Sequence, residues 1–505
     1  MTAVAGPRVA RAEPERVTSP VLVGRREELA WLSEALARVR SGGTAALLIG
    51  GDAGVGKSRL VSEFGAAGGV SAGAAGGVSA GVSAGAAGGA PVRVLTGRCP
   101  ELGAVGLPFA PFTAILRDLV RDWGTVGVAV PPGWELIRLL PELGEPARKG
   151  NPRSARARLF VQMVSLLEQL ARQRPVMLVI EDAHWADEST RDLISFLIDS
   201  QRAMDRVLII VTYRSDELHR GHPLRALLPR LGRLGWVQRT ELSGLSRGES
   251  AELVGHILGG EPAASLADRI YRRAAGNPLF VEELVRADRE PTATPCDLML
   301  AGVRRLPEQT QDVLRAASVG GQRTGRGLLS AVTGMGAEAL DAALRPAVAA
   351  GLLTADTDGY AFRHSLIGET LHQDLLPGEH TALHHRSAAA LEADPSLVPA
   401  GRAAIEQAQH WQHAHDPARA LSSAWQAAAD AGRALACGEQ LAMLTRVLEL
   451  WRSVPDAERL TGGDHAHVLR QAAAAASAAG DRQLGISLTA AARQAAESGR
   501  PLAAM

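Results

Sequence analysis

The stretch from Ala45 to Phe64, AALLIGGDAGVGKSRLVSEF, decides the expected fold, because an apolar run meets a glycine-rich turn and then an amphipathic segment. It fits the pattern G-x-x-x-x-G-K-[ST], in which a buried strand leads into a phosphate-binding loop and a helix follows. Gly51, Gly54 and Gly56 let the backbone turn its N–H groups inward, where they face phosphate oxygens. The agreement of strand, loop and helix argues against a chance match and predicts a nucleotide phosphate site.

The residue types in this loop suggest separate roles. Lys57 is placed to reach the β- and γ-phosphates, and the hydroxyl of Ser58 is placed to hold Mg²⁺. The expected cofactors are therefore ATP or ADP and Mg²⁺. The residues expected to surround the nucleotide are Gly51, Asp52, Ala53, Gly54, Val55, Gly56, Lys57, Ser58 and Arg59.

Composition narrows the class of protein. The 505 residues exceed one ordinary domain, and 54 basic residues balance 54 acidic ones, so the net charge gives no overall attraction to nucleic acid or to an anionic membrane. Cys99, Cys296 and Cys437 lie far apart without metal-ligand spacing, which is typical of inert thiols in a reducing compartment. No stretch has the continuous apolar core of a signal peptide or a membrane span, so we expect a cytoplasmic protein without a membrane partner.

A second informative stretch is PVMLVIEDAHWAD, Pro175–Asp187. Its apolar run is suited to a buried parallel strand, and it ends in Glu181 and Asp182 at the edge where α/β sheets bind ligands. One carboxylate there can hold Mg²⁺ or its water shell while the other orients or deprotonates the attacking water. Such a pair is a weak signal alone, but a phosphate loop earlier in the chain strengthens it.

Three arginines have two open interpretations each. The strand expected in RVLIIVTYRSDE, Arg206–Glu217, ends in Thr212 and Arg214, which are suited to contacting the γ-phosphate or sensing its loss. The alternative is a surface arginine after an edge strand. Arg25 and Arg26, in a turn before the first strand, are equally compatible with a ligand contact or with ordinary surface charge.

The order of segments predicts an α/β P-loop domain with a parallel sheet, then a helical lid, a winged helix and all-α helical repeats. In the lid, Gly276-Asn277-Pro278 forces a break in a helical pattern. The expected segments are a disordered arm at 1–20, the ATPase core at 21–240 with a flexible Gly/Ala/Ser insertion at 65–90, the lid at 241–300, the winged helix at 301–395, and repeats resembling tetratricopeptide repeats at 396–505.

The predicted winged helix consists of three helices followed by two short strands around a turn at Thr357-Asp358-Gly359. Its third helix carries Glu338 and Asp341 against Arg345 alone. A helix that enters the major groove should be basic. The pattern therefore favours a packing module, and we expect no direct DNA binding.

The region beyond residue 400 predicts helical pairs that recur about every 45 residues. His410, His413 and His415 lie close together in the sequence there. Because no matching set of further ligands is apparent, these histidines are interpreted as solvated residues on a helix face and not as a metal site.

Seven motifs occur in a characteristic order: LVGRREEL, GDAGVGKSRL, GRCPELGAVGLPFAPF, LVIEDAHWAD, VTYRSDEL, AAGNPLFVEEL and FRHSLI. Together they resemble the signal-transduction ATPases with numerous domains, and within that group the large ATP-binding regulators of the LuxR type. The resemblance runs from about Leu22 to Leu376, and the helical repeats fit more loosely.

This resemblance implies a nucleotide-dependent switch with slow ATP hydrolysis, and it adds roles to single residues. Arg214 matches the sensor position, Pro278 matches a lid proline near adenine, and His364 matches a winged-helix histidine that contacts phosphate in the ADP-bound state. Glu181 and Asp182 match the acidic pair. Glutamate stands where many members have aspartate, so the residue that serves the metal stays open.

The resemblance also implies an inducer or protein partner at the repeats, and an ATP-dependent homo-oligomer is a further expectation. This sequence departs from the family in the segment that would read DNA. Full-length members end in a DNA-reading helix-turn-helix, which these 505 residues lack. The expected function is a transcriptional regulator of the LuxR-family type without that segment in this chain, and the alternative is a stand-alone AAA-type ATPase or scaffold that acts through a partner protein.

Overall fold

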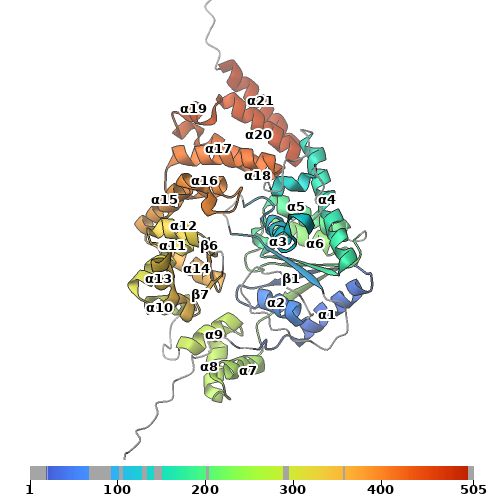
Figure 1. The fold of residues 1–505 in the computed structure, drawn as a ribbon, viewed down its shortest axis with the longest axis vertical. Helices are drawn as coiled ribbons and strands as arrows, with labels where there is room; N and C mark the ends of the chain where they lie inside the picture. The colour runs from blue at the N-terminus through green and yellow to red at the C-terminus, as the bar shows by residue number, and fades with distance from the viewer. Residues whose placement is uncertain are drawn as a thin grey trace, which may run out of the picture.

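The computed structural model describes residue 19 and residues 21–67, 92–101, 106–127, 133–140, 151–200, 204–287, 295–356 and 359–498 (Figure 1). Most of the predicted arm at 1–20, most of the predicted insertion at 65–90, and the predicted turn residues Thr357 and Asp358 lie outside the described residues. The first three positions of that insertion belong to a helix instead.

A five-stranded parallel sheet forms the centre of the ATPase core, which confirms the predicted α/β fold. Three of its strands are buried along their whole length, as their apolar sequences predict. The spatial order is β2-β3-β4-β1-β5, so the three strands singled out in the sequence, β1, β4 and β3, are neighbours. The strands are β1 (Ala45–Gly51), β2 (Arg93–Arg98), β3 (Val176–Glu181), β4 (Val207–Thr212) and β5 (Val237–Leu242).

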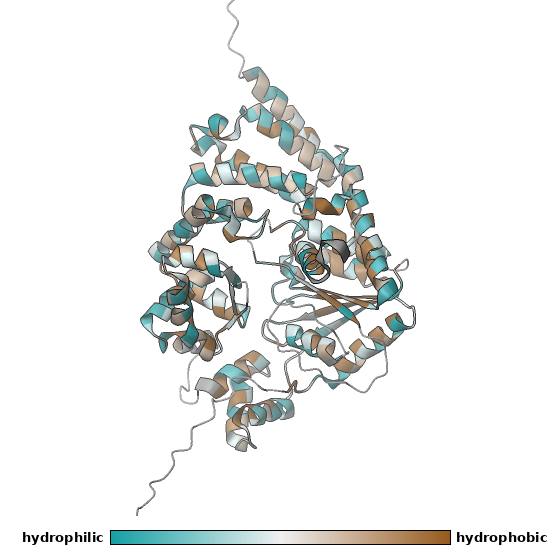
Figure 2. Cartoon of the chain, viewed as in Figure 1, coloured by the Kyte–Doolittle hydropathy of each residue, from teal (hydrophilic) through white to brown (hydrophobic). Residues whose placement is uncertain are grey.

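Helices cover both faces of this sheet, and alternate strand residues belong to two different apolar clusters. Leu47 and Ile49 pack with α1 and α2, whereas Ala46 and Leu48 belong to the cluster that includes α3, α4, α5 and α6. Figure 2 shows the hydrophobic strands lying between these helices. The helices are α1 (Arg26–Arg40), α2 (Lys57–Ala67), α3 (Ala110–Gly127), α4 (Pro152–Gln173), α5 (Glu188–Asp199) and α6 (Pro223–Leu231).

The lid consists of α7 (Arg247–Leu258), α8 (Ala264–Ala274) and α9 (Pro278–Ala287), which lie below the sheet in Figure 1. The predicted break between the last two helices is confirmed. Gly276 has a φ of +77°, and a Cβ there would clash with the backbone of Leu245. Pro278 then begins α9, where its missing N–H costs no helical hydrogen bond.

The next region has the predicted three helices and two strands, together with a third strand. The sheet is antiparallel in the order β6-β8-β7. The strand β6 was missed because it has only three residues and no apolar alternation. The elements are α10 (Pro295–Arg304), α11 (Glu308–Val319), β6 (Arg323–Gly325), α12 (Arg326–Thr333), α13 (Ala337–Ala349), β7 (Leu353–Ala355), β8 (Gly359–Phe362) and α14 (Ser365–Gln373). We call these elements the wing.

A helical array follows, and its successive helices pack on one another, which confirms the predicted pairing of helices beyond residue 400. In Figure 1 the array extends from the wing across to α5. Among the described helices, none combines the length and the apolar character needed to cross a membrane. The helices are α15 (Pro377–Ala393), α16 (Ala403–His413), α17 (Pro417–Arg433), α18 (Cys437–Leu450), α19 (Ala457–Thr461), α20 (His465–Ala479) and α21 (Arg482–Ser498).

Two of the three cysteines can be placed. Cys99 and Cys437 are buried free thiols, as the sequence predicted. The side chain of Cys296 lies outside the described residues.

Candidate functional site

The phosphate loop has the backbone that its glycines predicted. The φ angles are +146° at Gly51, +78° at Gly54 and +100° at Gly56, all in a region that favours glycine. The side chain of Lys57 folds back over the loop, and its Nζ donates to the carbonyl oxygens of Gly51 (2.6 Å) and Asp52 (2.9 Å). Because α2 begins at Lys57, the unpaired N–H groups of its first turn face the same side of the loop.

The carbonyl groups of the loop are bound by other parts of the chain. Asn277 donates through Nδ2 to the carbonyl of Ala53 (2.8 Å), and the N–H of Leu279 donates to the carbonyl of Gly54 (3.4 Å). The half-buried Pro278 lies between these two lid residues. A Cβ on Gly54 would come within 2.9 Å of Asn277 and Leu279, so glycine permits the close approach of the lid. The sequence indicated a break at Asn277 but not its contact with the loop.

Arg25 lies behind the loop and is buried. Its Nη2 donates to the carbonyl of Val55 (3.0 Å) and to that of Ser243 at the start of the lid (2.8 Å). Interpreting Arg25 as surface charge is therefore wrong, although the interpretation holds for the exposed Arg26. The observed role of Arg25 is to connect the loop to the lid.

Arg59, expected to surround the nucleotide, contacts other residues. It donates to the carbonyl of Ser19 (2.7 Å) and lies 3.6 Å from the carboxylate of Glu282 in the lid helix α9. Ser58, one position earlier, is half-buried in the first turn of α2.

The acidic pair lies at the end of β3, as predicted. Arg98 stands opposite Glu181 in the neighbouring strand β2 and donates to its Oε2 through Nη2 (2.7 Å) and Nε (3.1 Å). Asp182 has a φ of +55° and lies 3.5 Å from Arg98. The hydroxyl of the buried Thr212 accepts a hydrogen bond from the N–H of Asp182 (3.2 Å). Arg98 was missed as a site residue, although an arginine that ends the strand beside two acids is a usable signal.

Charges from three strand ends act on one another at this edge of the sheet. Burial lowers the pKa of Lys57, Asp182 raises it, and Arg214 lowers it further. Burial also raises the pKa of Asp182, which Arg98, Arg214 and Lys57 oppose. The ends of β3, β4 and β1, which are neighbours in the sheet, therefore meet at one edge, where Glu181 and Asp182 were expected to face a ligand. Ser58, Glu181 and Asp182 offer the oxygen ligands that Mg²⁺ prefers.

Arg214 links this edge of the sheet to the wing. It is buried after an interior strand, so the interpretation as a surface arginine after an edge strand is wrong. Its guanidinium bonds to Glu217 and to the hydroxyl of Ser365, and Nη2 donates to Glu369 Oε1 (2.9 Å). Burial alone would lower the pKa of Arg214, but the hydrogen bonds and charges of Glu369 and Glu217 raise it. His364, one residue before α14, is half-buried beside this contact.

The other end of the acidic motif meets the helical array. Asp187 accepts from the N–H of Thr190 (2.8 Å) and so caps α5. The first turn of α5 also has a partner from α18, because Glu439 accepts from the N–H (3.0 Å) and the hydroxyl (2.6 Å) of Ser189. Burial, together with the charge of Glu439, raises the pKa of Asp187 well above its usual range. Neither Glu439 nor Glu369 was predicted from the sequence.

Comparison with known proteins supports the assignment of the N-terminal part of this chain to an ATPase domain. The family model described as AAA ATPase domain matches residues 21–210. An uncharacterized protein of Rhizobium meliloti is 27% identical over 398 residues, or 72% of this chain and 36% of the relative, so the chain spans about a third of that relative's length.

Two solved structures are also similar. A signal transduction ATPase with numerous domains from Pyrococcus horikoshii, which carries a tetratricopeptide repeat sensor, is 14% identical with a TM-score of 0.43, covering 97% of this chain and 79% of that one. A Walker-type ATPase of Pyrococcus abyssi is 15% identical with a TM-score of 0.34, covering 72% and 99%.

The phosphate loop, the acidic pair and strands β1, β2 and β3 lie within the matched region, β4 crosses its border, and β5 follows it. This chain therefore contains an AAA ATPase domain.

Proposed function

We propose that this chain is an ATP-binding regulatory switch in which Arg214 transmits the state of the nucleotide to the wing. The observation that carries the proposal is the position of this one side chain. It interacts electrostatically with Lys57 and Asp182, and its guanidinium binds Glu369 and Ser365 of α14. The guanidinium of Arg214 would therefore both sense the γ-phosphate and hold the wing.

The loop residues are suited to binding a triphosphate with Mg²⁺. The N–H groups at the start of α2 and the ammonium of Lys57 would bind phosphate oxygens, after Lys57 leaves its bonds to Gly51 and Asp52. Ser58 and one carboxylate of the Glu181–Asp182 pair would hold Mg²⁺. When bound, Mg²⁺ neutralises charge that develops on the phosphates.

The contacts of Glu181 favour slow hydrolysis over sustained turnover. A residue that orients or deprotonates the attacking water needs a free carboxylate oxygen. Two hydrogen bonds from Arg98 engage Glu181 Oε2 and hold the carboxylate toward β2, so we propose that this contact must rearrange before the group can orient a water molecule. We therefore propose that turnover is gated by a change in this pair.

The switching step follows from competition for one guanidinium. Arg214 can direct its planar fork to the carboxylate of Glu369 or to a γ-phosphate, and a bidentate partner of either kind excludes the other. ATP would shift the wing only by the difference in affinity between the two arrangements. Loss of the γ-phosphate would return Arg214 to Glu369.

We propose more specifically that this switch is a transcriptional regulator of the LuxR-family type in the cytoplasm. The seven ordered sequence motifs and the helical array support it, and the array would receive an inducer or a protein partner. ATP-dependent homo-oligomers are a further part of this proposal. The alternative is a stand-alone ATPase or scaffold. Fast ATP turnover without any inducer would favour the ATPase, and bound ADP that never exchanges would favour the scaffold.

The direct test is nucleotide affinity in Lys57→Ala, measured by calorimetry with ATP and Mg²⁺. Removing a buried cation that pairs with phosphate should weaken ATP binding by at least about 30-fold. The control is Arg38→Ala, which removes an exposed cation on α1 and should bind ATP like the wild type. Unaltered ATP binding in Lys57→Ala would overturn the phosphate site.

A further inference from the structure

The junction between the wing and the helical array contains a cluster of histidine rings. His372 ends α14, His380 and His384 lie on α15, and His410 and His413 lie on α16. Neighbouring ring centroids lie between 4.3 and 5.7 Å apart. The sequence-based interpretation of solvated residues on a helix face is wrong for His410, which is 6% exposed.

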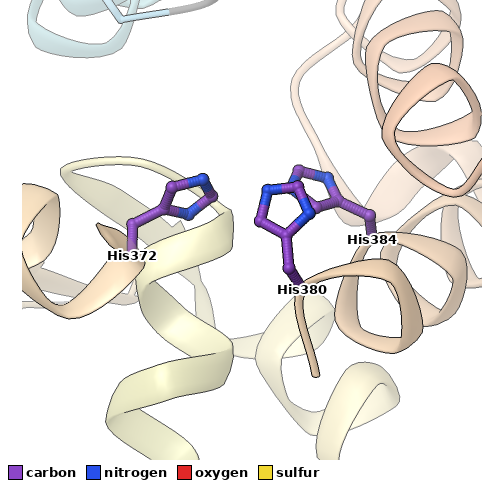
Figure 3. Close-up of side chains that lie close together, drawn as sticks. All are labelled: His372, His380 and His384. Atoms are coloured by element: carbon purple, nitrogen blue, oxygen red, sulfur yellow. The ribbon is translucent and has the colours of Figure 1, made fainter. Parts of the chain in front are cut away.

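We propose that His372, His380 and His384 form a binding site for one divalent transition-metal ion of the Zn²⁺ class. One nitrogen from each ring lies within 4.8 Å of the other two. Figure 3 shows the rings of His380 and His384 side by side, with the ring of His372 facing them from another helix. The sequence-based interpretation considered only the histidines near residue 410, whereas the metal-ligand set lies in a different stretch of the chain.

The spacing of the ligands fits a metal site. His380 and His384 are four residues apart, so both rings project from one face of α15. A tetrahedral ion with Zn–N bonds of about 2.0–2.1 Å holds its ligand nitrogens about 3.4 Å apart. Small changes in side-chain torsion would bring the three nitrogens from their observed separation to that value. A fourth position is left for water or for His413, whose ring centroid lies 4.6 Å from that of His384.

The hydrogen bonds of His384 prepare one nitrogen to bind metal. Its Nδ1 lies 2.8 Å from Nδ1 of His410, so this pair shares one hydrogen bond. The other nitrogen, Nε2, is buried without a hydrogen-bond partner among the described residues, and so is Nδ1 of His372. A ligating histidine typically uses its second nitrogen for such an orienting bond. A metal ion would satisfy both unpaired nitrogens.

The cluster favours neutral rings, which metal binding requires. Burial lowers the pKa of His384 to about 2 and that of His410 to about 4, and each is lowered further by the neighbouring histidines. Burial also lowers the pKa of His372 and His380. Three neutral imidazoles are a donor set that suits Zn²⁺, Ni²⁺ and Cu²⁺ rather than Mg²⁺ or Ca²⁺.

An ion at this site would tie α14 to α15 and so fix the wing to the start of the helical array. Because α14 also carries Glu369, the metal would restrain the helix that Arg214 contacts. The metal site does not depend on the proposed switching function, since its ligands lie on α14 and α15 and none of them belongs to the phosphate loop.

The test uses the full chain without an affinity tag, stripped with a chelator and then titrated with Zn²⁺ and separately with Co²⁺. We expect one ion per chain with a dissociation constant below about 10 µM, a Co²⁺ spectrum of a tetrahedral nitrogen site, and a higher Tm with Zn²⁺. His380→Gln and His372→Gln should each weaken Zn²⁺ binding at least about tenfold. His410→Gln, which removes the orienting bond, should weaken it by about 10- to 100-fold.

The matched control is His256→Gln, a half-buried histidine in the lid helix α7, far from the cluster in sequence, which should bind Zn²⁺ like the wild type. Circular dichroism and ATP binding report whether each variant is folded. Absence of stoichiometric binding to the wild type would mean that the rings are only packed together, and this result overturns the proposal. Zn²⁺ binding that is unchanged in both His380→Gln and His372→Gln also overturns it.

Discussion

Besides the lid, the ATPase domain contacts two other parts of the chain, and these two contacts differ in chemistry. The wing is held at the sensor edge by a guanidinium, with Arg214 bound to Glu369 and Ser365. The helical array is held mainly by apolar packing, because Leu435 and Ala436, in the turn between α17 and α18, belong to the same core cluster as the sheet, and Glu439 adds two hydrogen bonds to Ser189. A charged contact can be exchanged for a phosphate, whereas a shared core cannot. In the proposed switch, the wing contact is therefore the one that can be exchanged, and the array contact is the one that stays.

The free energies expected for the two contacts also differ, which supports an exchangeable wing contact and a stable array contact. Burying a leucine side chain contributes about 1.5–3 kcal/mol and needs no partner of matching charge. An ion pair between partly buried groups loses hydration as it gains attraction, so its net contribution is small. Removing Arg214 from Glu369 therefore costs little if a phosphate replaces the carboxylate.

The largest expected effect is on the docked array. Leu435→Ala leaves a cavity in a core that spans two parts of the chain, and such truncations typically cost about 2–5 kcal/mol of unfolding free energy. Leu258→Ala, the same truncation at a side chain that is 52% exposed, is the control and should cost less than about 1 kcal/mol. Urea unfolding of the full chain measures both. Equal losses would contradict the shared core.

A smaller loss is expected where the array caps α5. Glu439→Ala leaves the N–H and the hydroxyl of the buried Ser189 without an acceptor, which should cost about 2 kcal/mol. Glu439→Gln keeps an acceptor oxygen and should lose less than half as much. Glu449→Ala, on the exposed side of the same helix, should stay within about 0.5 kcal/mol of the wild type. If Glu439→Gln proves as damaging as Glu439→Ala, the charge and not the hydrogen bonding matters.

The stability contributed by the contact between α5 and the helical array should also depend on pH. Because the folded state raises the pKa of Asp187, it binds a proton that the unfolded state releases, and this contribution to stability is lost as pH rises. Relative to Asp187→Asn, the wild type should lose up to about 1.4 kcal/mol of unfolding free energy per pH unit from about pH 5 up to the raised pKa, and no more beyond it. In the Glu439→Gln background the pH range of this loss should narrow, since the charge of Glu439, which raises the pKa together with burial, is removed. A flat difference across pH would contradict the buried acid pair.

Local sequence predicted the features that depend on near neighbours. The apolar runs of β1, β3 and β4, the glycines of the phosphate loop and the break before Pro278 each follow from a short stretch with a fixed period or turn. The winged-helix order was also visible, apart from the short β6.

The missed residues depend on partners that are distant in the chain. Arg98 pairs with Glu181 across 83 residues, Arg214 with Glu369 across 155, and Ser189 with Glu439 across 250. No periodicity connects such positions, because their contact is created by the packing of whole elements. The histidine cluster was underestimated for the same reason, since His410 meets His384 only after α15 and α16 pack together.

The smallest effect on stability, and the sharpest test of the comparison, is expected at the wing. Glu369→Gln removes the charge that holds Arg214 but leaves Glu217 and Ser365 as partners, so the unfolding free energy should change by less than about 1 kcal/mol. ATP affinity should rise about fivefold, because the guanidinium no longer has to leave a carboxylate to meet the γ-phosphate. ADP affinity should change less, since ADP lacks that group. Calorimetric titration with each nucleotide measures the difference.

The matched control is Glu338→Gln, an exposed acid on α13 of the same wing, which should leave both affinities as in the wild type. Arg214→Ala gives the opposite sign, because it removes the group that both the carboxylate and the phosphate require, and it should weaken ATP binding more than ADP binding. If Glu369→Gln and Arg214→Ala shifted ATP affinity in the same direction, competition for one guanidinium would be excluded. Arg214 would then bind Glu369 and the γ-phosphate independently. The wing contact would be as fixed as the contact with the helical array.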